Sequence, residues 1–314
     1  MTVRTPLVPF PGTNLLVKPE SLQPTGAFKL RGAYAAISSL AATERERGVV
    51  THSSGNHGYA VAYAARLLGV RAAIVVPRTA PAVKTDAIAA AGAELILVEP
   101  TLRARQAAAA QVAAERGYAE IPPFDDARVI AGQGTIGLEI AQDLGGDGRR
   151  GPAAVVVPVS GGGLISGIAV AVRALLPDTR VIGVEPELAA DARESLRRGA
   201  PVTWPAADVA RTMADALRVE RVGDLTFAHM TALVSDIVTV TEDQIRAAVR
   251  RLALEARLVA EPGGAAAIAA ALAGPAALGL GDDARPVVAI LSGGNIAPDA
   301  LARVLSEETA SYNR

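Results

Sequence analysis

The chain has 314 residues, of which 50% are apolar and 20% are charged, and its formal net charge is −1. This balance provides no field to attract nucleic acid or an anionic membrane surface, and aromatic residues, at 3%, are too few for a base-stacking platform. The absence of cysteine excludes disulfides, thiolate catalysis and cysteine-ligated zinc. We expect a cytoplasmic protein, since the sequence shows neither a signal-peptide core nor an apolar run long enough to span a bilayer.

Short β-rich runs alternate with alanine-rich helical stretches along the chain. The expected strands are 14–18, 48–53, 71–77, 94–99, 153–159, 180–186, 236–241 and 286–292. The expected helices are 58–68, 82–91, 102–116, 164–176 and 243–257. A capping box from Thr241 to Gln244 marks the start of the last of these helices. Apolar strands separated by helices indicate an α/β fold with mostly parallel sheets covered by helices.

One of only three lysines in the chain, Lys29, lies at the start of a helix. Schiff-base chemistry needs an unprotonated amine at neutral pH, and burial in an apolar pocket favours that form. Phe28 and Leu30 are apolar neighbours, whereas Arg31 adds a nearby positive charge. Taken alone, this local sequence favours an ordinary solvated lysine.

Two further stretches place glycines and polar groups directly after a strand. Residues 53–58 read SSGNHG, and their hydroxyl, amide and N–H groups suit a carboxylate or a phenolic oxygen. The simpler alternative is that Ser54 or Asn56 caps the next helix, and this motif alone does not decide. Residues 160–164 read SGGGL, where three glycines before a helix favour a phosphate cradle over a tight structural turn.

A second Ser-Gly-Gly turn, SGGN at 292–295, follows the last expected strand. Ligands of open α/β sheets bind beyond the carboxyl ends of the strands. The two Ser-Gly-Gly turns therefore predict two walls of one ligand site.

Together and in this order, the motifs resemble the serine/threonine dehydratase group of fold-type II pyridoxal-phosphate enzymes, which includes serine racemase. The segments that carry this resemblance are RTPL (4–7), KPESLQPTGAFKLRGA (18–33), SSGNHG (53–58), GQGTIGLEI (132–140), SGGGL (160–164), GVEPE (183–187), VAEPGGAA (259–266) and SGGN (292–295). The resemblance implies a two-domain α/β fold of the tryptophan synthase β type. It places a large cofactor-binding domain at 1–47 plus 126–314 and a small, mobile substrate-side domain at 48–125. It also implies a homodimer, and no regulatory domain is expected after the SGGN segment.

The resemblance also implies a role for individual residues. Lys29 resembles the lysine that binds pyridoxal 5'-phosphate covalently, and Phe28 resembles the aromatic residue beside the cofactor. Asn56 resembles the amide that bonds the pyridine 3-oxygen, and Ser292 resembles the serine that faces the pyridine nitrogen. Ser54 resembles the catalytic serine that acts on the opposite cofactor face in racemising members. The implied phosphate cradle is Ser160, Gly161, Gly162, Gly163 and Leu164, and the implied substrate carboxylate site is Ser53, Ser54, Asn56 and His57.

A divalent-cation site follows from the same resemblance. Glu185, the carbonyl of Ala189 and Asp191 match the metal ligands of the racemase-like branch. Oxygen ligands suit Mg²⁺, Ca²⁺ or Mn²⁺. The alternative is that these are solvent-exposed acids after a strand.

The implied reaction is β-elimination of L-threonine, L-serine or both, which gives a 2-oxo acid and ammonia. Serine racemase and 3-hydroxyaspartate dehydratase stay open as alternatives, as does a non-catalytic protein that binds pyridoxal phosphate or an amino acid. The chain departs from the family pattern at three positions. Ala27 stands where serine is common, and Ser160 and Ala216 stand where glycine is common.

Overall fold

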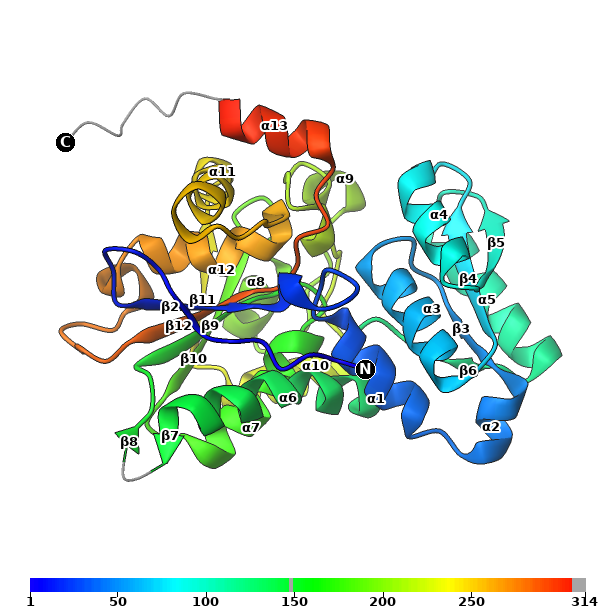
Figure 1. Ribbon diagram of the computed structural model, residues 1–314, viewed down its shortest axis with the longest axis horizontal. Coiled ribbons are helices and arrows are strands. Elements are labelled where there is room, and N and C mark those ends of the chain that lie inside the picture. The colour runs from blue at the N-terminus through cyan, green and yellow to red at the C-terminus, as the bar shows by residue number, and fades with distance from the viewer. Residues whose placement is uncertain (147–148, 307–314) are drawn as a thin grey trace.

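The computed structural model describes residues 1–146 and 149–306 and consists of two bodies side by side, each built on its own sheet (Figure 1). The larger sheet has the strand order β1-β2-β12-β9-β10-β11, and the smaller has the order β5-β4-β3-β6. The larger sheet is formed by β1 (Val8–Pro9), β2 (Leu15–Pro19), β9 (Ala154–Pro158), β10 (Arg180–Pro186), β11 (Asp236–Val240) and β12 (Val287–Leu291). The smaller sheet is formed by β3 (Val49–Thr51), β4 (Ala72–Pro77), β5 (Glu94–Val98) and β6 (Ala119–Glu120), and a separate hairpin by β7 (Gly145–Gly146) and β8 (Arg149–Arg150).

Helices connect the strands and cover both sheets. The first seven are α1 (Lys29–Ser38), α2 (Ala42–Arg47), α3 (Asn56–Leu68), α4 (Ala82–Ala90), α5 (Leu102–Arg116), α6 (Ala127–Leu144) and α7 (Gly163–Leu175). The others are α8 (Asp191–Arg198), α9 (Ala206–Val209), α10 (Asp224–Leu233), α11 (Glu242–Arg251), α12 (Pro262–Leu272) and α13 (Pro298–Ser306). Short helical turns are η1 (Glu20–Leu22), η2 (Asp215–Leu217), η3 (Leu252–Ala256) and η4 (Pro275–Leu278).

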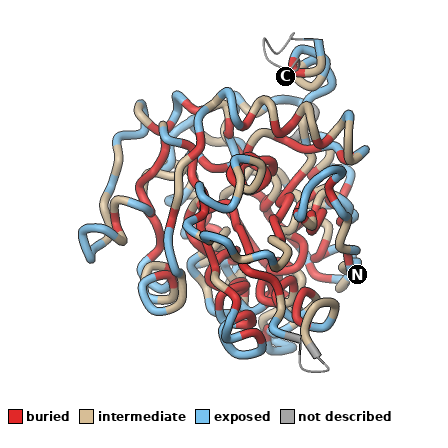
Figure 2. Tube along the Cα trace, turned by 90° about the vertical axis from the view of Figure 1, so that its left-hand side faces the viewer, coloured by how far each residue is buried: buried red, intermediate tan, exposed pale blue. Residues whose placement is uncertain are grey.

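The larger sheet is buried on both faces, because its strands are apolar at successive positions. In β9, Ala154 and Val156 pack in the core beneath α11 and α12, whereas Val155 and Val157 pack in the core beneath α6 and α7. Figure 2 shows the buried strands enclosed by partly exposed helices. The strand pairs of the larger sheet are parallel apart from β1 with β2, as expected for strands that helices cover on both faces.

The smaller sheet is buried in the same way. Ile74 and Val76 of β4 face α3 and α1, and Val75 faces α5. Leu30 and Ile37 of α1 belong to this core, although α1 also contacts α6 of the larger body. Helix α1 thus lies at the boundary between the two bodies, and the domain division at residues 47 and 125 stays a prediction.

The α/β fold predicted from the sequence is confirmed. Each of the eight expected strands and five expected helices is present, with ends shifted by a few residues at most, apart from the last helix. The capping box is also confirmed, since the Gln244 N–H donates to Thr241 Oγ1 at 3.2 Å and the Thr241 N–H donates to Gln244 Oε1 at 2.8 Å. The helix expected at 243–257 ends as α11 at Arg251 and continues into the π-helical turn η3, which Arg257 closes with a φ of 60°.

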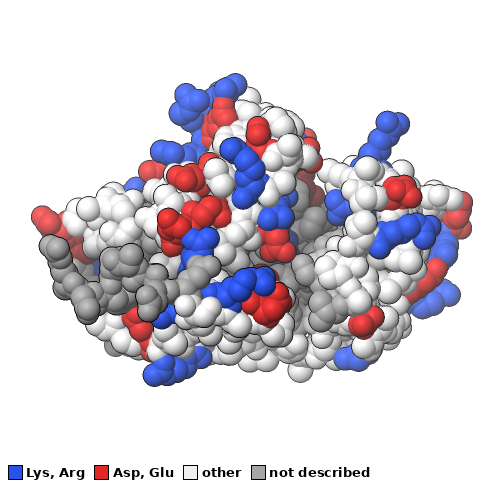
Figure 3. All heavy atoms as spheres, turned by 90° about the horizontal axis from the view of Figure 1, so that it is seen from above, with Lys and Arg blue, Asp and Glu red and all other residues white. Residues whose placement is uncertain are grey.

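On the face shown in Figure 3, positive and negative side chains are interspersed. Among the described residues, no helix has the length and apolar character needed to cross a membrane.

Candidate active site

The carboxyl ends of β9 and β12 meet at one edge of the larger sheet. These two strands are parallel neighbours, and Val155 lies beside Val288. The turns that follow them, 160–162 and 292–294, therefore leave the sheet on the same side. The structure thus brings the two Ser-Gly-Gly turns together, and that they bind one ligand stays a prediction.

The glycine turn is shaped by what packs against it. A Cβ on Gly161 would lie 2.3 Å from the Phe124 ring, and a Cβ on Gly162, whose φ is 91°, would lie 2.8 Å from Thr226. No larger residue fits there without a shift of these neighbours. In the described part of the chain, the N–H groups of Ser160, Gly161 and Gly162 donate to no backbone carbonyl. Since the first turn of α7 adds further unpaired N–H groups, the turn can bind an anion.

Lys29 is the first residue of α1, and its amine is enclosed. Its Nζ donates to the carbonyl oxygen of Pro123 at 2.6 Å and lies 5.0 Å from the centre of the Phe28 ring. Burial lowers the pKa of Lys29 to about 8. The solvated position favoured by the local sequence is therefore wrong. Pro123 precedes Phe124, so the same short segment contacts both the amine and the glycine turn.

The loop at 53–58 enters α3 without a side-chain cap. The N-cap is Gly55, so the alternative that Ser54 or Asn56 caps this helix is wrong. His57 is 2% exposed, and its Nε2 lies 2.9 Å from the carbonyl oxygen of Ile121. Burial, together with the positive charge of Lys29, lowers the pKa of His57 to about 3, so the imidazole is neutral at pH 7.

Ser292 lies where β12 meets the start of α1. The residue is 5% exposed, and its carbonyl accepts the Phe28 N–H at 3.0 Å. Ala27 forms an isolated bridge with Gly293 and is fully buried. A Cβ on Gly293 would lie 3.2 Å from the Ala27 methyl group. The departure from serine at position 27 therefore lies in a packed contact that holds Lys29 beside the serine turn.

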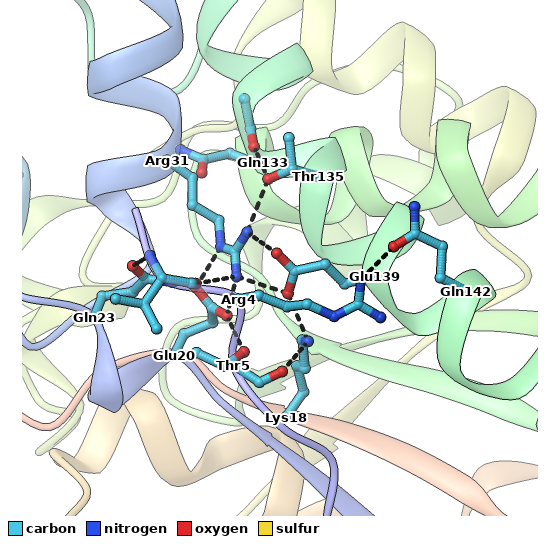
Figure 4. Close-up of polar contacts among 12 residues, drawn as sticks. Arg4, Thr5, Lys18, Glu20, Gln23, Arg31, Gln133, Thr135, Glu139 and Gln142 are labelled. Carbon is cyan, nitrogen blue, oxygen red and sulfur yellow. Dashed lines mark hydrogen bonds and ion pairs between the residues drawn. The ribbon is translucent and has the colours of Figure 1, made fainter. Parts of the chain in front are cut away.

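Four charged residues, Lys18, Glu20, Arg31 and Glu139, form a buried ion cluster behind α1 (Figure 4). Arg31 donates to both carboxylate oxygens of Glu20, at 2.7 and 2.8 Å, and from Nη1 to Glu139 at 2.6 Å. Lys18 donates to Glu139 and to the Thr5 carbonyl, each at 2.6 Å. The side chains of Lys18, Glu20 and Arg31 are at most 2% exposed.

The buried ion cluster balances two cations with two carboxylates. Burial alone would raise the pKa of Glu139, but hydrogen bonds from Arg31 and Lys18 outweigh burial and hold that pKa below its usual value. The cluster ties β2, η1 and α6 to the first turn of α1. Since Arg31 follows Lys29 by two residues, the cluster fixes the backbone from which the Lys29 side chain projects.

The three expected metal ligands are buried rather than solvent-exposed. Glu185 and Ala189 are at most 1% exposed, as is Asp191, so the alternative of exposed acids is wrong. Glu185 accepts two backbone N–H groups, at 2.8 and 3.0 Å, and Asp191 Oδ2 has no hydrogen-bond partner among the described residues. Burial, followed by the charge of Asp191, raises the pKa of Glu185 well above its usual value, and burial raises that of Asp191 to about 7.

A buried carboxylate pair needs protons or a cation to balance its charge. The described residues contain no group of three or more acidic or histidine side chains that would hold a metal. The expected set has only two carboxylates and a carbonyl, so the metal site stays a prediction.

Comparison with known proteins decides the family. The family model described as "Pyridoxal-phosphate dependent enzyme" matches residues 2–293. The chain belongs to this family. An L-threonine ammonia-lyase of Thermotoga maritima is 40% identical over 96% of this chain and 72% of its own length. A serine racemase of Arabidopsis thaliana is 41% identical, with coverage of 91% and 84%. An L-threo-3-hydroxyaspartate ammonia-lyase of Saccharomyces cerevisiae is 39% identical, with coverage of 94% and 87%.

A solved structure of this pyridoxal-phosphate enzyme family has the same fold. The processed form of threonine deaminase isoform 2 from Solanum lycopersicum superimposes with a TM-score of 0.90 at 38% identity. The match covers 98% of this chain and 89% of that one. The expected fold type is therefore confirmed.

The residues present fit pyridoxal phosphate. The glycine turn offers N–H groups to a phosphate, and Lys29 offers a buried amine with a lowered pKa. The Ser292 carbonyl accepts the N–H of Phe28, the residue before α1. Asn56 bonds Asn295, which bonds the Thr25 carbonyl. The role of each residue is a proposal, developed below.

Some residues near this site were given no role from the sequence. Pro123 and Phe124 lie in a stretch without a motif, so no signal marked them. Glu261 and Asn295 lie inside VAEPGGAA and SGGN, and both contact Asn56. The sequence marks Arg31 only as a charge near Lys29, because its ion-pair partners lie 11 and 108 residues away along the chain.

Proposed function

We propose that the chain catalyses β-elimination of L-threonine, L-serine or both, releasing a 2-oxo acid and ammonia. The observation that carries this proposal is the enclosed Lys29 amine, whose pKa is lowered to about 8, beside a glycine turn with free N–H groups. The ammonia-lyases among the relatives support the reaction class.

The proposed cofactor site uses residues from four segments. Lys29 would form the covalent link to pyridoxal phosphate, and Phe28 would lie beside the ring. The N–H groups of residues 160–164 would bind the phosphate, and Asn56 would donate to the 3-oxygen. Ser292 would face the pyridine nitrogen, where a neutral hydroxyl would not hold a proton as a carboxylate does. When bound, the cofactor supplies an electron sink for negative charge at the substrate α-carbon.

The chain's own groups then carry the proton transfer. Ser53, Ser54, Asn56 and His57 surround the substrate carboxylate with serine hydroxyl groups and with the backbone N–H groups at the start of α3. Once the substrate amino group has replaced Lys29 at the cofactor, the free Nζ takes the α-proton, because an amine with a pKa near 8 is partly unprotonated at neutral pH. The neutral His57 adds no positive charge beside that amine.

Replacing Lys29 by alanine tests the assignment. The Lys29→Ala protein should lose the visible absorbance of covalently held cofactor and the release of ammonia from L-threonine and L-serine. Lys84→Ala, which removes a lysine from α4, is the control and should keep both. Retention of both signals by Lys29→Ala would refute the proposal.

Serine racemase activity is the second candidate. The Arabidopsis relative and the retained Ser54, which caps no helix, favour it. Racemisation needs an acid/base on each face of the substrate, with Lys29 on one face and Ser54 on the other. Ser54→Ala should therefore abolish formation of D-serine from L-serine and spare formation of pyruvate. Equal loss of both products would remove the racemase reading.

Substrate preference is tested with a panel. We expect 2-oxo-acid formation from L-threonine, L-serine or both to exceed that from the 3-hydroxyaspartate isomers. Faster conversion of a 3-hydroxyaspartate isomer would instead indicate a 3-hydroxyaspartate ammonia-lyase, as the yeast relative is named. A purified protein that binds pyridoxal phosphate but converts none of these compounds would favour the non-catalytic alternative.

The remaining assignments rest on the family resemblance. We propose that residues 48–125 move as a small domain against 1–47 plus 126–314, which agrees with the two separate sheets. We also propose a homodimer in the cytoplasm, to be tested by sedimentation. The buried Glu185 and Asp191, with the Ala189 carbonyl, are proposed to bind Mg²⁺, Ca²⁺ or Mn²⁺.

A further inference from the structure

The Asn56 side chain is held from both ends by residues of the larger body. Its Nδ2 donates to Glu261 Oε1 at 2.6 Å, and its Oδ1 accepts from Asn295 Nδ2 at 2.7 Å. We call Asn56, Glu261 and Asn295 the interlobe triad. Asn56 opens α3 beside the smaller sheet, whereas Glu261 precedes α12 and Asn295 follows β12.

The two bonds specify the same orientation of the Asn56 amide independently. A Glu261 carboxylate only accepts hydrogen bonds, so the group that faces it must be the NH₂ of Asn56. On the other side, Asn295 Nδ2 also donates to the Thr25 carbonyl at 2.8 Å, and a carbonyl only accepts. Asn295 therefore presents its nitrogen, not its oxygen, to Thr25 and Asn56. Because this nitrogen donates, Asn56 must present its Oδ1 to Asn295.

This orientation leaves one N–H of the Asn56 amide, and no described residue accepts it. We propose that Glu261 and Asn295 are positioning residues that keep this N–H available for the 3-oxygen of the cofactor, and that the same bonds latch the two bodies together. The proposal rests on the proposed function, which assigns the 3-oxygen to Asn56. If the Asn56 amide were reversed, its Oδ1 would face the 3-oxygen of the cofactor and repel it.

The two partners differ in environment. Glu261 is 5% exposed, and its N–H donates to the Gly293 carbonyl at 3.1 Å, so its backbone is tied to the serine turn. Asn295 is exposed. The Glu261 bond is therefore the inner part of the triad and should suffice to orient the amide when Asn295 is removed.

Two substitutions at position 295 separate orientation from latching. Asn295→Ala removes the hydrogen bond from Asn295 to Asn56 and leaves the bond from Asn56 to Glu261 in place. Asn295→Asp places a second acceptor beside Asn56, so both N–H groups of the amide turn to carboxylates and none is left for the cofactor. Both variants lose the hydrogen bond to the Thr25 carbonyl, because neither alanine nor an aspartate carboxylate can donate to it. Ala297→Asp adds the same charge nearby at an exposed position and is the charge control.

Two measurements are needed on each protein. The first is the equilibrium affinity for pyridoxal phosphate, from the visible absorbance. Asn295→Asp should bind at least about 10-fold more weakly than the wild type, the value of one hydrogen bond to a charged group. Asn295→Ala should change this affinity by less than about 3-fold, and Ala297→Asp should leave it unchanged.

The second measurement is amide hydrogen exchange at the start of α3 in the apoprotein, which needs no cofactor. Asn295→Ala should exchange several-fold faster there because one latch bond is gone, and Asn295→Asp should exchange at the wild-type rate. Equal behaviour of the two variants in both measurements would overturn the inference. If Asn295→Asp fails to fold, Glu261→Gln takes its place, and wild-type exchange in that protein would overturn the latch. Failure of the wild type to bind pyridoxal phosphate would refute the proposed function instead and leave the exchange result intact.

Discussion

Arg31→Met tests whether the buried ion cluster determines stability. Methionine keeps most of the volume of arginine but leaves Glu20 and Glu139 without their main cation. The Arg31 side chain is 2% exposed and that of Glu20 is fully buried. Removing one partner of a buried ion pair costs about 3–5 kcal/mol. At about 2–4 °C per kcal/mol, the melting temperature should fall by roughly 10 °C.

The assay is thermal unfolding followed by circular dichroism, with Arg303→Met as the matched control. Arg303 pairs with Asp299 at 2.9 Å, but both side chains are at least 67% exposed, so the control should unfold like the wild type. Adding Glu20→Gln to Arg31→Met should recover part of the loss, since a neutral amide costs less to bury than an unpaired carboxylate. The reasoning fails if Arg31→Met and Arg303→Met unfold at the same temperature.

The pH dependence gives an independent check. The pKa of Glu139 is held below its usual value of 4.5, so its stabilising contribution is present above that pH and is lost as pH falls below it. Arg31→Met removes the largest of the hydrogen bonds that lower this pKa. The stability difference between the wild type and Arg31→Met should therefore narrow as the pH falls from about 5 to about 3. A difference that stays constant over this range would show that the charge of Glu139 is not involved.

Three further predictions concern the site. Mg²⁺ or Ca²⁺ should raise the melting temperature more at pH 8 than at pH 5.5. The pKa of Asp191 is raised to about 7, so this carboxyl is protonated at pH 5.5 and cannot bind the cation well. Without metal, stability should fall as the pH rises and Asp191 ionises. Asp191→Asn should remove the metal effect, and an unchanged effect would place the cation elsewhere. Gly161→Ala should weaken pyridoxal-phosphate binding on the order of 10-fold or more, since its Cβ would lie 2.3 Å from the Phe124 ring. Gly199→Ala is the control: its φ of 70° makes the substitution cost stability, but its Cβ would meet no neighbour, so the folded protein should bind the cofactor normally. The rate at which the apoprotein takes up pyridoxal phosphate should rise with pH as Lys29 loses its proton, with a midpoint near pH 8; a midpoint near 10 would refute the lowered pKa.

The sequence predicted the fold well because its signals were local. Apolar runs such as that of β9 and the capping box at Thr241 depend on neighbouring residues only, and both appear where expected. The helix expected to reach residue 257 ends at Arg251. The sequence does not predict this end, because hydrophobic periodicity does not distinguish an α-helical turn from the π-helical turn η3.

The candidate site needed more than local signals. The segment around Lys29 favoured a solvated lysine, and only the Pro123 carbonyl, 94 residues away, shows that the amine is enclosed. The sequence left open whether Ser54 or Asn56 caps α3; neither does, and Asn56 instead bonds partners 205 and 239 residues away. Contacts at such separations are set by how the sheets pack, and one sequence does not encode them in a readable pattern.

The burial of Lys18 leaves few amines of this chain open to chemical labelling. The sequence has three lysines, and the Lys18 side chain is fully buried and ion-paired, so amine-directed reagents do not reach it in the folded protein. In a Lys84→Arg background, Lys29 and the N-terminal amine are then the only remaining amine targets. In the purified protein, protection of Lys29 from such a reagent would then report that the cofactor is bound.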